Sequence, residues 1–204
     1  TATVYTGEAV KIPLLRYKIE AIAQRAGFDA NSHDGRTLAY VVETIPRDEM
    51  FQMSEDELFI TAMGILRLRN RPRIGLFVRR DPFERFVAAI AFVPRDRYGT
   101  TLRITWQGVL EQAFNGKVVA HHVEVTDNPL ARLHFIIKTT PGQVPAYNTE
   151  EIEVMLKEAA RTWEDRLYQA LIEAKGEEAG ISLFRRYARA FPGAYRERFS
   201  SDLT

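Results

Sequence analysis

The residues of this chain that could do acid–base or metal chemistry are few, because it has four histidines and no cysteine. The lack of cysteine excludes thiol nucleophiles, disulfides and cysteine-liganded metal sites, and it fits a reducing cytoplasm. His121 and His122 alternate to opposite faces of an expected strand, so at most one of them can pair with His134 across a hairpin. Glu124 shares the face of His122 and could join it on a metal. Surface histidines explain the same pattern more simply, and we predict no metal site.

Positive charge is concentrated in one stretch of an otherwise balanced chain. Overall, 28 Lys and Arg face 27 Asp and Glu, or 28 − 27 = +1. Residues 67–85 hold seven arginines against two acidic residues, a local balance of 7 − 2 = +5, with Phe77, Phe83 and Phe86 among them. Such a stripe could bind nucleic acid through phosphates and base stacking. Several of these arginines also flank an expected helix end, where the helix dipole favours cations. Nucleic-acid binding therefore stays the alternative function.

Several classes of protein are excluded by missing patterns. The sequence has no GxGxxG and no GxxxxGK[ST] motif, so we expect no nucleotide cofactor in this chain. It also lacks a signal-peptide pattern and an apolar run of about 18 residues, so we expect no membrane partner. Because it begins at Thr1, we interpret it as a segment of a longer protein.

The first 71 residues have helical spacing. Pro13 stands at an expected helix start, and Gly27 ends that helix. A second helix, around residues 38–45, stops before Pro46. Ser54 and Glu57 form a capping box that opens a third helix, which ends before Pro72. We expect a helical segment over residues 1–71.

Residues 72–175 contain the same unit twice. Strands at 74–78 and 86–93 precede a helix at 102–114, and strands at 118–125 and 130–139 precede a helix at 152–171. Residues 86–93 are apolar on both faces, as in a covered central strand. Two ββα units of one period predict a four-stranded antiparallel sheet with both helices on one face, an α+β sandwich. Residues 176–204 form a further helical segment, whose aromatic stripe at positions 184, 187, 191, 195 and 199 indicates a docking face.

Six stretches match one known protein family in order and at consistent spacing. They are IPLLRYKIEAIAQRAGFDANSHDGRTL (12–38), IPRDEMFQMSEDELF (45–59), FVRRDPFERFVAAIAFVPRDRYGTTLR (77–103), ARLHFIIKTTPG (131–142), RTWEDRL (161–167) and RYARAFPGAYRERF (186–199). Together they resemble the large bacterial NAD-specific glutamate dehydrogenases, in the N-terminal region that carries ACT-like modules. Two positions depart from the family: Gly99 replaces a common asparagine helix cap, and Glu84 replaces a common glycine.

The resemblance implies a parent enzyme that oxidises L-glutamate to 2-oxoglutarate and ammonia with NAD. Its catalytic and dinucleotide-binding domains would lie C-terminal to this segment, which would hold no catalytic and no cofactor-binding residue. The ββα pair would be an ACT-like, ferredoxin-like sandwich, although its helices and strands do not follow one another in the order βαββαβ. Its partners would be the other domains and subunits of a cytoplasmic homo-oligomer.

The resemblance also indicates where an amino-acid effector could bind. ACT-type sites form where sheets or loops of two modules meet. Turns rich in Arg and Asp are the corresponding candidates here, because charge-assisted pairs can hold an anion or a subunit. The candidate effector or interface residues are Arg79, Arg80, Asp81, Arg95, Asp96 and Arg97.

Overall fold

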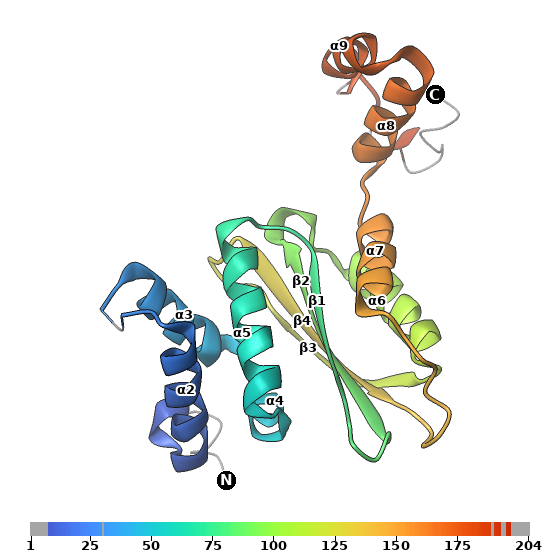
Figure 1. The fold of residues 1–204 in the computed structure, drawn as a ribbon. Helices are drawn as coiled ribbons and strands as arrows, with labels where there is room; N and C mark the ends of the chain where they lie inside the picture. The colour runs from blue at the N-terminus through green and yellow to red at the C-terminus, as the bar shows by residue number, and fades with distance from the viewer. Residues whose placement is uncertain (1–7, 30, 189, 193–194, 197–204) are drawn as a thin grey trace. The chain divides into compact units, whose positions relative to one another are not determined.

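The computed structural model describes residues 8–29, 31–188, 190–192 and 195–196. The chain divides into two compact units, Thr1–Val154 and Met155–Thr204. The first unit contains the N-terminal helices and a four-stranded antiparallel sheet (Figure 1). The fold is therefore α+β, as the sequence predicts.

The helices opened by Pro13 and by the capping box of Ser54 begin and end where the sequence predicts, whereas the helix expected around residues 38–45 already begins at His33. After the 3₁₀ turn η1 (Ala9–Lys11), helix α2 (Pro13–Ala26) has proline in its first turn and ends at Gly27, whose φ of 66° is left-handed. The hydroxyl of Ser32 caps α3 (His33–Thr44) by accepting the Gly35 N–H. The predicted capping box of Ser54 and Glu57 opens α5 (Glu55–Asn70).

One helix was missed. Helix α4 (Arg47–Gln52) occupies the segment between Pro46 and Met53, which the sequence analysis left without structure. Its six residues are too few to show a helical period, and its apolar residues Met50 and Phe51 are adjacent. Tertiary contacts stabilise this short helix.

The sheet consists of two hairpins joined edge to edge. Strands β1 (Gly75–Arg80) and β2 (Phe86–Pro94) form the first, and β3 (Lys117–Glu124) and β4 (Leu130–Lys138) form the second. Because β2 also pairs with β4, the order is β1-β2-β4-β3. Residues 87–93 of β2 are all buried, which confirms the predicted central strand.

The two faces of the sheet pack against different helices. Ile90 and Phe92 of β2 join the hydrophobic core of α2, α3 and α5. The alternate residues of β4, such as Phe135 and Ile137, are fully buried on the other face. That face is covered by α6 (Thr100–Ala113), which follows the turn η2 (Arg95–Arg97), and by the start of α7 (Thr149–Ala159) (Figure 1). The element order ββαββα matches the prediction.

The edge strand β3 is left largely uncovered. Residues 119–122 are exposed, although their neighbours on β4 are partly or fully buried. At the other edge, the Leu76 N–H of β1 donates to the Glu153 carboxylate of α7 at 3.1 Å. The sheet therefore has one edge that a side chain partly closes and one that remains open.

The second unit holds two further helices, α8 (Trp163–Lys175) and α9 (Glu177–Tyr187). The single helix predicted over 152–171 is wrong, because α7 ends at Ala159 and a capping box of Thr162 and Asp165 starts α8. The predicted aromatic stripe packs within this unit: Phe184 lies edge-on to Tyr168, and Phe191 contacts Trp163. Residue 199 of the stripe lies outside the described residues.

Two glycines of the first unit allow a test of its packing. A Cβ on Gly116 would lie 2.6 Å from the Lys138 carbonyl oxygen, whereas a Cβ on Gly108, exposed in α6, would meet nothing within 4 Å. We expect Gly116→Ala to lower the free energy of unfolding by about 1–3 kcal/mol, because β4 must shift. Gly108→Ala should raise it by about 0.5–1 kcal/mol, since alanine favours the helix. Urea titration followed by circular dichroism measures both, and equal effects would contradict this packing.

Candidate functional site

Helix α4 is held at its C-terminal end by a lysine of α2. Lys18 Nζ donates to the carbonyl oxygens of Met50 at 3.0 Å, Phe51 at 3.2 Å and Met53 at 2.5 Å. A cation at this end also meets the negative pole of the helix dipole. Burial lowers the pKa of Lys18, although Glu55 and Glu57 act in the opposite direction. The N-terminal helices thus fix the position of α4 over the sheet.

From that position α4 directs Glu49 onto the sheet. Glu49 is 1% exposed, and its Oε2 accepts a hydrogen bond from Arg79 Nε at 2.6 Å. Its Oε1 lies 3.3 Å from His134 Nε2. Burial raises the pKa of Glu49, but hydrogen bonds from His134 and Arg79 outweigh burial, and the pKa lies below its usual value. Glu49 is therefore a buried carboxylate stabilised as the anion.

Sheet register explains why Arg79 and His134 meet the same carboxylate. Arg79 pairs with Ala88, and His134 pairs with Ile90, two residues further along β2. Residues two apart on a strand share a face, so both side chains point toward α4. His122 of β3 pairs with His134 and lies on this face as well. The predicted cross-strand histidine pair is thus His122 with His134.

A cavity of about 440 Å³ opens between α4 and the sheet. Its floor is the row Ala88, Ile136 and Ala120, which the register places side by side on β2, β4 and β3. Polar side chains surround that floor; they are Asp48, Glu49, Gln52, Arg79, Asp81, Arg85, His121, His122 and His134. Small residues on the floor and polar groups around it give this cavity the composition of a ligand site.

The predicted effector residues do not form one surface. Arg79, Arg80 and Asp81 lie at the turn between β1 and β2, whereas Arg95, Asp96 and Arg97 follow the opposite end of β2. The nine residues of β2 separate the two groups by about 25 Å. The six candidates therefore lie in two separate turns, one at each end of β2. A role for either group in effector binding or in an interface stays a prediction.

Each of these groups has local partners. Arg80 pairs with Glu84 at 2.7 Å, and Asp81 pairs with Arg85 at 3.1 Å. Side-chain and backbone hydrogen bonds from Arg85 hold the pKa of Asp81 below its usual value. At the other end of β2, Arg95 Nη1 donates to the Thr126 carbonyl oxygen at 3.1 Å. Two of the six, Arg79 and Asp81, line the cavity from buried positions, each with 7% of its surface exposed.

Both departures from the family pattern have visible consequences. Glu84 adopts a left-handed φ of 55°, the conformation that glycine adopts without strain. Its carboxylate compensates by accepting the Gly142 N–H at 2.8 Å and by pairing with Arg80. Gly99 is the N-cap of α6 and supplies no side-chain hydrogen bond.

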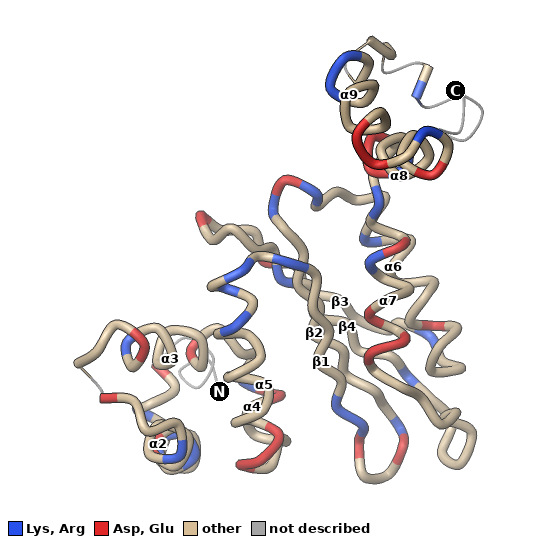
Figure 2. The backbone as a smooth tube through the Cα atoms, turned by 45° about the horizontal axis from the view of Figure 1, so that its top comes forward, with Lys and Arg blue, Asp and Glu red and all other residues tan. Residues whose placement is uncertain are grey.

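The arginine stripe is dispersed in three dimensions. Arg79 is buried, Arg80 and Arg85 pair with carboxylates, and the Arg69 guanidinium stacks on the Tyr40 ring at 4.4 Å. Figure 2 shows basic residues of this stretch near the end of α5 and others at the β1–β2 turn, at opposite ends of β1. A continuous phosphate-binding surface is absent from this stretch, so the structure does not favour the nucleic-acid alternative.

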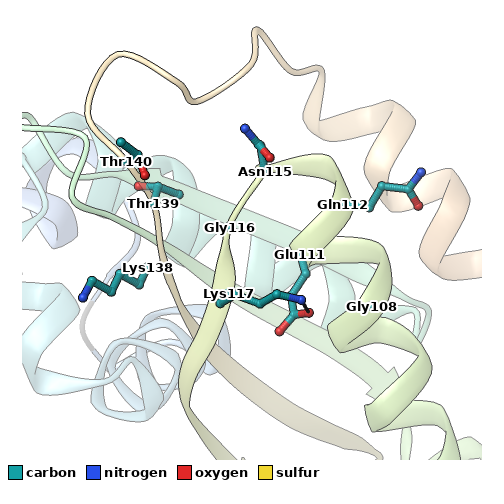
Figure 3. A pocket seen from close by; sticks show the side chains of 9 residues that line it. All are labelled: Gly108, Glu111, Gln112, Asn115, Gly116, Lys117, Lys138, Thr139 and Thr140. Atoms are coloured by element: carbon teal, nitrogen blue, oxygen red, sulfur yellow. Dashed lines mark hydrogen bonds and ion pairs between the residues drawn. The ribbon is translucent and has the colours of Figure 1, made fainter.

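A second hollow, of about 580 Å³, lies where α6 meets β3 (Figure 3). Its carboxylate, Glu111, pairs with Lys117 at 2.9 Å and accepts the Val118 N–H at 3.0 Å. The hydrogen bond from the Val118 N–H lowers the pKa of Glu111 the most, and the one from Lys117 lowers it further. Lys138 points away from this pair in Figure 3. The hollow is open to solvent and its charged pair is internally satisfied, so the cavity under α4 is the stronger candidate.

Within the described ranges of the chain, no group of three or more His, Asp or Glu residues is arranged to hold a metal ion. No helix there is both long and apolar enough to cross a membrane.

Three models of known families match successive parts of the chain. The model "Glutamate dehydrogenase, helical motif 1" matches residues 12–71, "Glutamate dehydrogenase, ACT2 domain" matches 75–164, and "Glutamate dehydrogenase, helical motif 2" matches 170–202. The middle match contains the whole sheet together with α6 and α7.

Curated relatives match over nearly the whole chain. The NAD-specific glutamate dehydrogenase of Halomonas elongata is 38% identical over 201 residues, or 98% of this chain. Those of Pseudomonas aeruginosa and Mycobacterium tuberculosis are 36% and 31% identical, over 98% and 93% of this chain. In each case the chain spans 12% of the length of the relative.

The buried carboxylate offers a stability test. Glu49→Gln leaves Arg79 without its counter-charge, so we expect the free energy of unfolding to fall by about 3–5 kcal/mol. The matched control is Glu20→Gln, because Glu20 forms an exposed pair with Arg16 at 4.0 Å and should change stability by less than about 0.5 kcal/mol. Urea denaturation measures both variants, and similar losses would contradict a structural role for Glu49.

The same group predicts a pH dependence. The folded pKa of Glu49 is below its unfolded value, so its contribution is complete above the unfolded pKa and is lost as the pH falls through the folded one. We expect the loss of stability on acidification to be smaller in Glu49→Gln than in the unmodified chain. Thermal unfolding between neutral and acidic pH measures this difference, and parallel curves for the two proteins would refute it.

Proposed function

Because the chain belongs to the large NAD-specific glutamate dehydrogenase family, we propose that it is a noncatalytic segment of such an enzyme that serves subunit assembly or allosteric response. The parent enzyme would oxidise L-glutamate to 2-oxoglutarate and ammonia while reducing NAD. NAD would bind to domains outside this segment, in a cytoplasmic homo-oligomer.

One observation carries the proposal: the three matching models name an ACT2 domain and two helical motifs, and together they account for most of the chain. The missing glycine-rich phosphate loop agrees with a segment that binds no dinucleotide. The relatives are about eight times longer than this chain, which leaves room for catalytic domains elsewhere. The functional partners would be those domains, the other subunits and an amino-acid effector.

The proposed functional parts follow the boundaries expected from the sequence. They are a helical segment over 1–71, an ACT-like module over 72–175 and a helical segment over 176–204. The buried contact of Glu49 with Arg79 and His134 supports joint action of the first two, because it links a helix of one to the sheet of the other.

The absence of catalysis can be measured directly. The isolated chain, mixed with L-glutamate and NAD, should produce no NADH above a protein-free blank, as followed by absorbance. Production of NADH in proportion to the chain concentration would refute a noncatalytic role.

The assembly role needs the parent enzyme. A parent enzyme that lacks the region equivalent to residues 12–202 should still bind NAD. It should, however, assemble with fewer subunits than the intact enzyme or lose its response to amino acids. Analytical ultracentrifugation and activity assays with an amino-acid panel measure these outcomes. A deleted enzyme with unchanged assembly and unchanged response would contradict the proposal.

A further inference from the structure

Arg79 has more hydrogen-bond donors than the protein satisfies. Its Nε donates to Glu49, but within the described residues neither of its two terminal nitrogens has an acceptor. Neither nitrogen is fully enclosed by protein, so both are accessible to solvent. Since Arg79 is 7% exposed and lines the cavity, its free N–H groups are accessible from the cavity.

Among the described residues, no carboxylate around the cavity accepts a hydrogen bond from the terminal nitrogens of Arg79. Glu49 already receives Arg79 Nε and faces His134, and Asp81 accepts from the side chain and the backbone of Arg85. Asp48 has an interaction of its own. An acceptor for the terminal nitrogens of Arg79 must therefore come from outside the described residues.

The floor restricts what such an acceptor could belong to. Ala88, Ala120 and Ile136 are apolar and lie in one row across the sheet, and the two alanines leave the hollow unfilled. Its volume of about 440 Å³ lies within the usual range for small-molecule sites. His122 shares the face of Ala120 and adds a ring nitrogen at the open side of the cavity. A small molecule with one anionic group and a short apolar chain matches this lining.

We propose that the cavity between α4 and the sheet binds a small organic carboxylate. The carboxylate accepts hydrogen bonds from the terminal nitrogens of Arg79, whose planar fork matches its two oxygens. The apolar part of the molecule lies on Ala88, Ala120 and Ile136. A phosphate fits less well, because no lysine lines the cavity and a phosphate has no apolar part to lie on the floor. Use of the site for regulation rests on the proposed function, whereas binding itself does not.

The ligand class is tested by calorimetric titration of the 204-residue chain with matched probes. Butyrate carries the carboxylate and the apolar chain, butyramide is its neutral counterpart, L-2-aminobutyrate adds an ammonium group, and inorganic phosphate is the anion without a chain. We expect butyrate or L-2-aminobutyrate to bind at least about tenfold more tightly than butyramide and phosphate. Tighter binding of phosphate, or no heat from either carboxylate at millimolar concentration, would overturn the proposal.

Variants locate the binding. Ala120→Leu fills the hollow from an exposed position on β3 and should weaken carboxylate binding at least about tenfold. Arg79→Lys keeps the charge but loses the fork, and should weaken it about fivefold. Val123→Leu, on the opposite face of the same strand, is the control and should stay within about twofold.

Far-UV circular dichroism establishes that each variant is folded, and Ala120→Leu tests the site even if Arg79→Lys does not fold. Unchanged binding in Ala120→Leu would overturn the location. A negative result here leaves the assembly role untouched, since sedimentation of the parent enzyme tests that role separately.

Discussion

The buried carboxylate of Glu49 is the contact on which the arrangement of helices and sheet in the first unit depends. A charge at 1% exposure is tolerated only when donors replace the water it has lost, and Arg79 and His134 supply them from two different strands. Those donors are available only if α4 lies over the sheet at the right level. Lys18 provides that placement by binding three carbonyl oxygens at the end of α4. The polar network thus specifies one position of α4 on the sheet, whereas apolar packing alone would allow several.

The cavity follows from the same geometry. Helix α4 is short and meets the sheet through a polar side chain, so it does not fill the space above Ala88 and Ala120. The uncovered strand β3 forms the open side. A buried guanidinium that is only partly paired then faces the hollow. The Arg79 side chain therefore serves both the docking of α4 and the proposed ligand site. A ligand bound in the cavity would act on the contact between Arg79 and Glu49 that holds α4 on the sheet.

This arrangement suits a segment of a much larger enzyme. The chain spans 12% of the length of its glutamate dehydrogenase relatives, and in the sequence its ACT-like sheet is preceded and followed by regions matched by helical motifs. Its near-neutral total charge conceals local imbalance, because the exposed arginines Arg71 and Arg73 directly precede β1. In the proposed function such surfaces would face other parts of the parent.

Local signals in the sequence determined the elements that carry their own start and stop residues: Pro13 and Gly27 for α2, the capping box of α5, and the two hairpins with their apolar alternation. Resemblance of motifs determined the family. Helix α4 escaped detection because six residues carry too little periodicity, and Glu49 escaped with it. The partners of the Glu49 carboxylate, Arg79 and His134, lie 30 and 85 positions away in the chain. Tertiary structure alone decided these features, because strand register and helix docking, rather than sequence neighbours, bring a buried charge to its partners.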